Sequence, residues 1–387
     1  MKTTLTYNNQ QLEKLGGLDT AREIARQPLI WQQLEDILHN QQTKISKFLS
    51  PILLQPNLQI ILTGAGTSAY VGQTIAAYLN SVYSNTPPTQ ASNSNIQFCA
   101  IATTDIVSNP QAFLFAERPT LLVSFARSGN SPESLACVNL ASQCVKNIHH
   151  LIITCNEQGT LHLAATKPNQ HNSFSLLMPK DSNDKSFAMT SSFTVMTMAA
   201  LNIFDATPPN SDIQACCNQV LTSQSLQAIK TMAELDFNKI VFIGSGPLAA
   251  TAQEASLKML ELSKGLVNSY FETVLGFRHG PKSVVDEKTV VIILDSQQDY
   301  QRQYENDLFN ELKADQQSPF VYTMSKLLPN MPAKLKDVWL SFPYIVYCQV
   351  LAFYKALALD ITPDNPCPTG EVNRVVQGVS IYPYQPN

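Results

Sequence analysis

The stretch that decides the fold covers residues 240–281 and reads IVFIGSGPLAATAQEASLKMLELSKGLVNSYFETVLGFRHGP. It begins with an apolar run over 240–243, which predicts a buried strand. The run leads through Gly244-Ser245-Gly246 into a long segment rich in Ala, Leu and Met. A strand that passes through a glycine turn into a helix places backbone N–H groups where an anion can bind. The stretch therefore predicts a strand–turn–helix unit of the anion-binding kind.

Three charged residues of this predicted helix share one face. Glu254, Lys258 and Glu261 stand at i, i+4 and i+7, and the surrounding positions are Ala, Leu and Met. A partly buried carboxylate near a phosphate-type turn is suited to act as a general base, so all three are candidate catalytic residues. For Glu254 and Lys258, a solvated surface pair worth about 0.3–0.5 kcal/mol fits the spacing equally well. Glu261 has apolar neighbours, which favours the functional interpretation.

The composition narrows the class of protein. The chain has 387 residues, 44% of them hydrophobic and 14% charged, which indicates two globular domains and an appendage. A net charge of -4 argues against nucleic-acid and anionic-membrane partners. No apolar run reaches the roughly 18 residues of a membrane span, and the N-terminus lacks an apolar signal core. We expect a cytoplasmic soluble protein.

The cysteines and histidines predict no metal site. The eight cysteines are scattered without CxxC spacing, which favours reduced thiols over a disulfide framework or a zinc site. The six histidines have no shared spacing with acidic residues or cysteines. By residue type alone, His279 is more often structural or exposed than catalytic. Gly280-Pro281 makes a rigid turn that could aim its ring, and Arg278 could contact an anion.

The second half of the chain repeats the first. The strand and glycine turn at 240–246 match those at 60–66, and the strands at 290–294 and 320–323 match those at 121–125 and 151–154. Continuous Val, Ile and Leu strands alternating with helices predict parallel sheets covered by helices on both faces. The fold class is therefore α/β, with two tandem three-layer αβα sandwiches related by internal duplication.

These patterns also place the domains and the connecting segments. We expect a helical N-terminal segment at 1–45, a first sandwich at 46–205 and a second sandwich with a C-terminal tail at 213–387. The Pro-containing stretch 205–212 is the predicted linker. Polar sequence at 85–95 predicts a loop, and 169–187 is expected to be irregular.

Two turns of the first half are candidates for binding a phosphate. Gly64-Ala65-Gly66-Thr67-Ser68 alone is weak evidence, because a tight turn or a dinucleotide site can look alike, although position 69 lacks the third glycine. The second turn, at 127–131, adds hydroxyls, a glycine and a cation after another strand, where open α/β sheets bind ligands. Ser131-Pro132 also fits a helix N-cap. The candidate phosphate ligands are Gly66, Thr67, Ser68, Arg127, Ser128, Asn130 and Ser131.

Four segments carry a resemblance to a known family. ILTGAGTSA, VSFARSGNSPES, AMTSSFT and GFRHGPKS resemble the sugar isomerase (SIS) domain family, present here twice. Residues 45–387 are similar to the isomerase half of glucosamine-6-phosphate synthase, without its glutaminase half. The length and the segments ARSGNSPES and LGFRHGPKS resemble the galactosamine-6-phosphate deaminase/isomerase group, also called tagatose-6-phosphate ketose/aldose isomerases.

The resemblance implies roles for individual residues. Ser68 and the turn at 127–131 would hold the 6-phosphate of a sugar. Glu261 would move a proton between C1 and C2, with Glu254 and Lys258 as its polar companions. His279 would open the sugar ring, often from a neighbouring subunit. The favoured mechanism needs no metal and no organic cofactor, and family habit suggests a homodimer or higher homo-oligomer with shared active sites.

Two positions depart from the synthase pattern. Gln377 stands where the synthase has a lysine near its C-terminus, which puts a lysine-assisted step in doubt. Ala126 replaces the first serine of the phosphate loop, which suggests that Arg127 takes over part of the phosphate contact.

The function that fits is an isomerising deamination, in which galactosamine 6-phosphate and water give tagatose 6-phosphate and ammonium. A ketose/aldose isomerase without deamination uses the same base, and a non-catalytic phosphosugar sensor is an alternative from another class. A dehydrogenase fits less well. The galacto or gluco preference, the number of subunits and the residue that activates water stay open.

Overall fold

The computed structural model describes residues 3–85, 95–168, 170–205 and 208–385. Two compact units emerge, and each is described by itself. One comprises Leu29–Asn183, Ser191–Pro208 and Val372–Asn387, and the other comprises Met1–Pro28, Asp184–Thr190 and Pro209–Glu371. Residues 86–94 of the expected loop and 206–207 of the expected linker lie outside the described residues.

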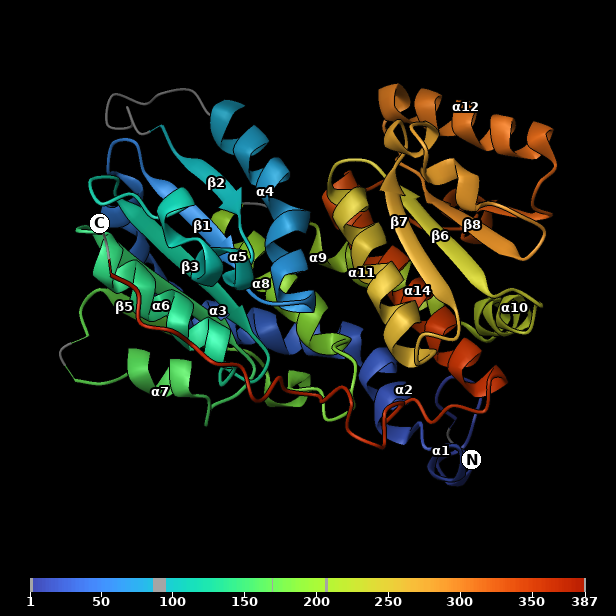
Figure 1. The fold of residues 1–387 in the computed structure, drawn as a ribbon, viewed down its shortest axis with the longest axis horizontal. Coiled ribbons are helices and arrows are strands. Elements are labelled where there is room, and N and C mark those ends of the chain that lie inside the picture. Colours follow the sequence, from blue (N-terminus) through green and yellow to red (C-terminus); the bar gives the residue numbers. More distant parts are fainter. Residues whose placement is uncertain (1–2, 86–94, 169, 206–207, 386–387) are drawn as a thin grey trace. The chain divides into compact units, whose positions relative to one another are not determined.

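The first unit is built on a parallel sheet of five strands in the order β2-β1-β3-β4-β5 (Figure 1). The strands are β1 (Gln59–Thr63), β2 (Gln97–Ala100), β3 (Thr120–Ala126), β4 (Ile148–Thr154) and β5 (Ser173–Leu177). The strands predicted near 60, 121 and 151 are confirmed. The expectation that 169–187 is irregular was wrong, because β5 lies within it. As a half-exposed edge strand, β5 has no continuous apolar run that a sequence pattern could reveal.

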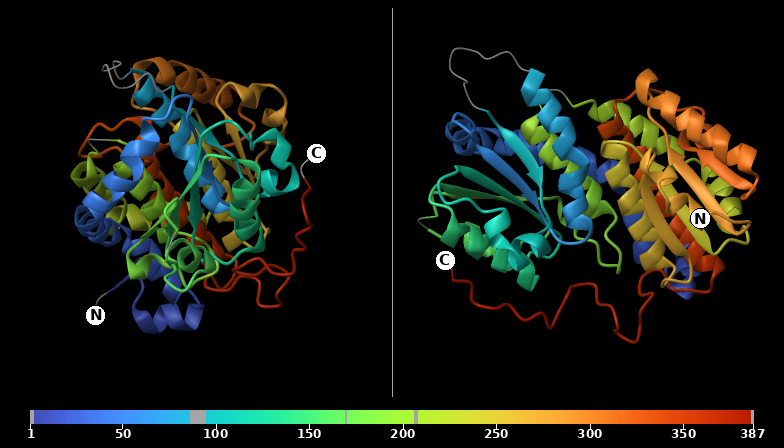
Figure 2. Two further views of the ribbon diagram at one scale, coloured as in Figure 1. Left: turned by 90° about the vertical axis from the view of Figure 1, so that its left-hand side faces the viewer. Right: turned by 45° about the horizontal axis from the view of Figure 1, so that its top comes forward.

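Helices cover both faces of this sheet (Figure 2). α4 (Thr67–Asn85) packs against α8 (Ser191–Phe204), and α5 (Thr103–Ser108) packs against α6 (Pro132–Cys144), which contacts α7 (Thr160–Ala165). α3 (Gln27–Leu53) joins α8 through a hydrogen bond from Trp31 Nε1 to Thr194 Oγ1, 3.2 Å long. α8 is buried along nearly its whole length, as its uniformly apolar sequence predicts.

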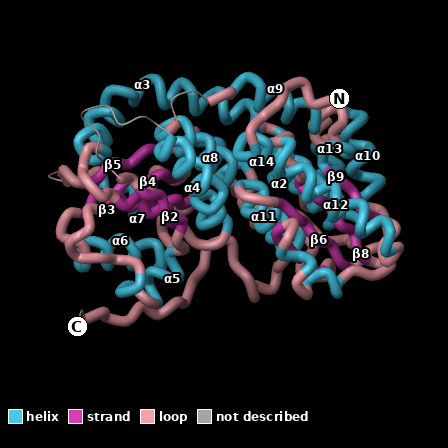
Figure 3. The backbone as a smooth tube through the Cα atoms, turned by 90° about the horizontal axis from the view of Figure 1, so that it is seen from above, coloured by secondary structure: helices cyan, strands magenta, loops and turns pink. Residues whose placement is uncertain are grey.

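The second unit has a parallel sheet of four strands in the order β7-β6-β8-β9. Its strands are β6 (Lys239–Gly244), β7 (Asn268–Thr273), β8 (Thr289–Leu294) and β9 (Phe320–Thr323). α11 (Pro247–Leu262) packs on β6 and β7 and against α14 (Asp337–Ala358). The apolar side of α12 (Asp299–Asp315) packs into a core cluster with β6, β8 and β9. In the backbone tube, strands lie inside and helices outside (Figure 3).

Smaller helices complete this unit. α2 (Leu18–Ala25), α9 (Asn210–Val220) and α10 (Ser223–Ala233) all contact α14, while α1 (Asn9–Leu15) contacts α2 and α13 (Met324–Leu327) follows β9. α14 is long and apolar enough to cross a membrane, but 94% of its apolar window is buried inside the protein. It is therefore a core helix of the sandwich.

The two sheets share one topology, which confirms the internal duplication. The orders β2-β1-β3-β4 and β7-β6-β8-β9 correspond strand for strand, and β5 is an addition to the first sheet. The glycine turns correspond as well, because Gly66 has φ 56° and Gly246 has φ 55°. This left-handed conformation is strained for residues with a side chain. Both halves therefore need glycine at the same point of the same turn.

The compact units divide the chain differently from the ranges 1–45, 46–205 and 213–387. The first 28 residues group with the second sheet because α2 packs on α14. The tail after residue 371 groups with the first sheet, where Tyr384 packs against a core cluster that includes Ile61 and Leu122. Packing between segments distant in sequence sets this division, and no local pattern reports it.

Candidate active site

α11 carries a buried group of three charges. Lys258 Nζ lies 3.4 Å from Glu254 Oε1 and also forms an ion pair with Glu261 Oε2. The side chains of Glu254 and Lys258 are fully buried, whereas that of Glu261 keeps 24% of its surface exposed. The alternative of a solvated Glu254–Lys258 surface pair is therefore wrong. Burial of a charged pair is costly unless the geometry is good, so this arrangement is not a by-product of helix spacing.

The two carboxylates of this group, Glu254 and Glu261, differ in how accessible they are to solvent. Glu261 stands in the last turn of α11, at the edge of the buried group, where it can meet another molecule. Glu254 lies about two turns earlier and reaches only the interior. A carboxylate that is held by a buried ammonium and still accessible is equipped to accept a proton. Glu254 and Lys258 support it from behind.

In the first unit, the two candidate phosphate turns lie side by side. β1 and β3 are adjacent and parallel, with Thr63 opposite Ser124 in the register. The turns that follow these strands therefore emerge at the same edge of the sheet, where α/β folds bind ligands. Thr67 and Ser68 form the first turn of α4 and are largely buried. Helix N-termini favour anions at this position.

Hydrogen bonds shape the turn after β3. Ser131 Oγ accepts a hydrogen bond from Ser134 N, which confirms the predicted N-cap of α6, with Pro132 at its first position. Ser128 Oγ accepts from Asn130 N at 3.3 Å. Asn130 Oδ1 accepts from both the backbone N–H and the hydroxyl of Thr160, at 2.8 and 2.9 Å. The polar side chains therefore hold the backbone of the turn at the edge of the sheet.

Arg127 has a contact that sequence reasoning missed. Its guanidinium is buried and donates a hydrogen bond to the carbonyl of Arg374 in the C-terminal tail. The Arg374 side chain in turn donates to Asn183 Oδ1 at 3.3 Å. The tail thus passes close to the turn after β3, and Gln377 follows three residues later. A partner 247 positions away leaves no local signal in the sequence.

His279 lies on a loop after β7. The loop consists of the short helices η3 (Gly276–Arg278) and η4 (Pro281–Val284), with the exposed His279 and Gly280 between them. Arg278, considered above as an anion contact, instead forms an ion pair with Glu311, with 2.6 Å between Nε and Oε2. The structure thus groups Glu254, Lys258 and Glu261 in one place, and the two phosphate turns in another. These groups belong to different compact units.

The turn after β8, which corresponds to the turn after β3, is filled by the protein's own carboxylates. Glu305 Oε2 accepts from Ser296 N at 2.8 Å, and Asp337 Oδ1 accepts from Ser296 Oγ at 2.5 Å. Burial and the charges of Asp295 and Asp337 raise the pKa of Glu305 to about 7, despite that backbone hydrogen bond. The backbone N–H and the hydroxyl of Ser296 are therefore both bonded to carboxylates of the protein itself.

Comparison with known proteins places this architecture in a family. Residues 235–343 match the SIS domain. A Shewanella sp. (strain ANA-3) protein named D-galactosamine-6-phosphate deaminase AgaS is 46% identical over 385 residues, which span 99% of this chain and 96% of that protein. An Escherichia coli protein of the same name is 40% identical and is matched over 97% of its length, with 95% of this chain covered. This chain belongs to the AgaS family of SIS-domain proteins.

A solved structure supports the same membership. The crystal structure of tagatose-6-phosphate ketose/aldose isomerase from Escherichia coli is 38% identical and superposes with a TM-score of 0.85, covering 96% of this chain and 98% of that chain. The predicted tandem SIS fold is thereby confirmed. Since AgaS relatives match nearly end to end, both sandwiches, the tail and the N-terminal helices all belong to the family architecture.

Proposed function

We propose that this chain deaminates D-galactosamine 6-phosphate with isomerisation, giving D-tagatose 6-phosphate and ammonium. The observation that carries the proposal is the group on α11, in which buried Lys258 pairs with an accessible Glu261. The deaminase names of the AgaS relatives support the choice of substrate. No step of the reaction requires a cofactor, because proton transfer and hydrolysis suffice.

The roles follow the chemistry of each group. Ser68, Ser128 and the backbone of the two turns bind the 6-phosphate, with Gly66, Thr67, Arg127, Asn130 and Ser131 shaping that region. His279 assists opening of the sugar ring, which exposes the C1 aldehyde. Glu261 then removes the proton from C2 and delivers it to C1. The enolamine becomes a C2 imine, and water adds to C2 and releases ammonia, leaving the ketose 6-phosphate.

A second candidate activity is supported by the similarity to an isomerase structure. With a neutral sugar phosphate, the same proton transfer between C2 and C1 interconverts an aldose and a ketose. No C2 amino group is then present, and the reaction stops at tagatose 6-phosphate. Both activities depend on Glu261, so they differ only in the group at C2.

The deciding experiment measures ammonia release from galactosamine 6-phosphate and glucosamine 6-phosphate side by side. Wild type is compared with Glu261→Gln and with Glu287→Gln, a control carboxamide on the surface of the same unit. We expect release from the galacto sugar, lost only in Glu261→Gln, while that variant still binds substrate in calorimetry. Interconversion of tagatose 6-phosphate without ammonia release would support the isomerase. No turnover with intact binding would support a sensor.

We further propose that the active protein is a homodimer or a higher homo-oligomer with shared active sites. The edge strand β7 and the segments around it expose several large apolar side chains: Leu260, Leu266, Tyr270, Phe271 and Leu275. An exposed apolar edge strand is typical of a protein–protein contact. Mixing Glu261→Gln and His279→Asn chains, each with strongly reduced activity, tests the sharing. A dimer with shared sites regains about a quarter of wild-type activity, whereas unshared sites regain none.

We place the enzyme in the cytoplasm. The eight cysteines are free thiols, which suits a reducing compartment. Fusion to a fluorescent protein, followed by fractionation, checks this assignment.

A further inference from the structure

The loop that presents His279 is anchored in the core just before the histidine. Phe277 is fully buried in the cluster formed by the sheet and α12, with Val241, Ile293 and Leu308 among its members. Gly280, just after the histidine, has φ 120°, a conformation that side chains rarely adopt. The backbone on both sides is thus constrained, while the His279 ring itself is exposed.

A single carboxylate on α12 bridges the residues on either side of His279. Arg278 Nε lies 2.6 Å from Glu311 Oε2, and Lys282 forms an ion pair with Glu311 Oε1. Hydrogen bonds from Lys282 and Arg278 lower the pKa of Glu311, so it is ionised at neutral pH. Glu311 adjoins the buried Leu308 and Leu312 on α12, which directs it toward the loop.

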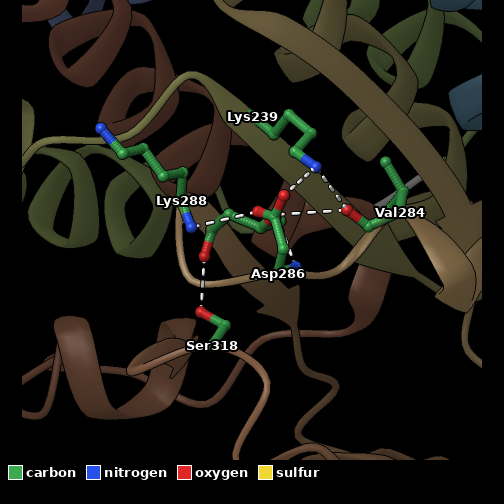
Figure 4. A network of polar contacts seen from close by, with 6 residues as sticks. Lys239, Val284, Asp286, Lys288 and Ser318 are labelled. Atoms are coloured by element: carbon green, nitrogen blue, oxygen red, sulfur yellow. Dashed lines mark hydrogen bonds and ion pairs between the residues drawn. The ribbon is translucent and has the colours of Figure 1, made fainter.

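The far end of the loop has an anchor of its own (Figure 4). Lys239 Nζ donates to the carbonyl of Val284 at 3.1 Å and forms an ion pair with Asp286. Asp286 Oδ1 also accepts from Lys288 N at 3.0 Å. These contacts hold the connection into β8 without any part of Glu311. The effect of Glu311 is therefore confined to the segment around His279.

We infer that Glu311 is a positioning residue, which holds the His279 ring for ring opening by bridging Arg278 and Lys282. The inference rests on the proposed function, in which His279 acts on the sugar. The three side chains are each about one-third exposed, so the ion pairs add little to the stability of the fold. Their effect lies in geometry, because a misplacement of about 1 Å can cost ~10²-fold in rate.

The test compares Glu311→Gln with a matched control, Asp315→Asn. Asp315 lies on the same helix and contacts Lys282 at 2.5 Å, but its loss leaves the Glu311 bridge in place. We expect Glu311→Gln to lower kcat about tenfold with KM nearly unchanged, and Asp315→Asn to behave as wild type. High salt should lower the kcat of wild type toward that of Glu311→Gln and should leave the kcat of the variant unchanged. Equal kcat in wild type and Glu311→Gln would overturn the inference.

A double variant separates positioning from a general structural role. If Glu311 acts through His279, adding Glu311→Gln to His279→Asn lowers kcat no further. A full additional loss in that background would contradict the inference.

Hydrogen exchange tests the Glu311 bridge to Arg278 and Lys282 without any substrate. Amides at 276–284 should exchange faster in Glu311→Gln than in Asp315→Asn, with equal melting temperatures. If wild type shows no turnover, the proposed function is refuted and the Glu311 bridge is not. If amide exchange at 276–284 is unchanged in Glu311→Gln, the Glu311 bridge is refuted and the proposed function is not.

Discussion

Lys258 and Glu254 form an ion pair that is entirely removed from solvent, with 3.4 Å between Nζ and Oε1. Both residues lie on α11, and their burial orients Lys258 toward Glu261 in the next turn. A buried lysine must keep a carboxylate partner, since an isolated charge in the interior is strongly unfavourable. The pair thus ties the stability of the second sandwich to the proposed base.

Replacing Lys258 tests this coupling. Lys258→Met leaves Glu254 buried without its ammonium, and we expect a loss of about 3 kcal/mol in the free energy of unfolding. The double variant Lys258→Met with Glu254→Gln should recover much of that stability, because no buried charge remains. It should not recover activity, since Glu261 still lacks its ion pair. Urea unfolding and ammonia release measure the two effects. A stable and active Lys258→Met would show that the buried pair is dispensable.

The two serines of the turn after β3 should respond differently to substitution. Ser131 caps α6 through its hydrogen bond from Ser134 N, so Ser131→Ala should destabilise the protein by about 1 kcal/mol. Ser128 is half-buried and its Oγ accepts a hydrogen bond from Asn130 N within the turn, so Ser128→Ala should raise KM for the phosphosugar with little effect on thermal unfolding. Steady-state kinetics and melting curves of both variants distinguish the roles. Identical behaviour would argue against separate functions.

Stability should fall as pH rises toward neutrality, in part through Glu305. Its pKa rises from 4.5 in the unfolded chain to about 7 in the fold. The neutral acid is therefore favoured by folding, and this contribution is complete below pH 4.5 and lost as pH passes 7. Glu305→Gln removes this dependence, so we expect it to exceed wild type by about 3 kcal/mol at pH 8.

The comparison at acidic pH controls that prediction. Below pH 4.5, Glu305 is protonated in both the folded and the unfolded chain, and the variant should match wild type. The free energy of unfolding of the variant still depends on pH, because burial and the charge of Asp184 also raise the pKa of Glu23 to about 7. An advantage of Glu305→Gln that is independent of pH would point to packing and not to ionisation.

The two glycine turns should tolerate alanine equally badly. A Cβ on Gly66 or Gly246 meets no atom within 4 Å, so crowding contributes nothing. The remaining cost is the positive φ, which we expect to destabilise each variant by about 1 kcal/mol. Chemical denaturation of Gly66→Ala and Gly246→Ala measures both. A large difference between them would mean that the turns are not equivalent.

Much of the fold could be predicted from local pattern. The apolar runs of β1, β3, β6 and β8 are buried on both faces, so composition alone marks them. β5 escaped prediction because its residues are half-exposed. The group on α11 was predictable from the helical spacing of Glu254, Lys258 and Glu261. The burial of this group could be predicted only in part, because it depends on α14 packing over α11.

The sequence by itself determined the duplicated sandwich, the glycine turns and the helical face that carries the charges. These depend on interactions between residues a few positions apart, which repeat with the period of a strand or a helix. Only the tertiary structure decided which carboxylate is accessible, that Arg127 holds the tail, and that Glu311 bridges the His279 loop. Those contacts join segments far apart in the chain, where folding in three dimensions sets the distances and local periodicity carries no information.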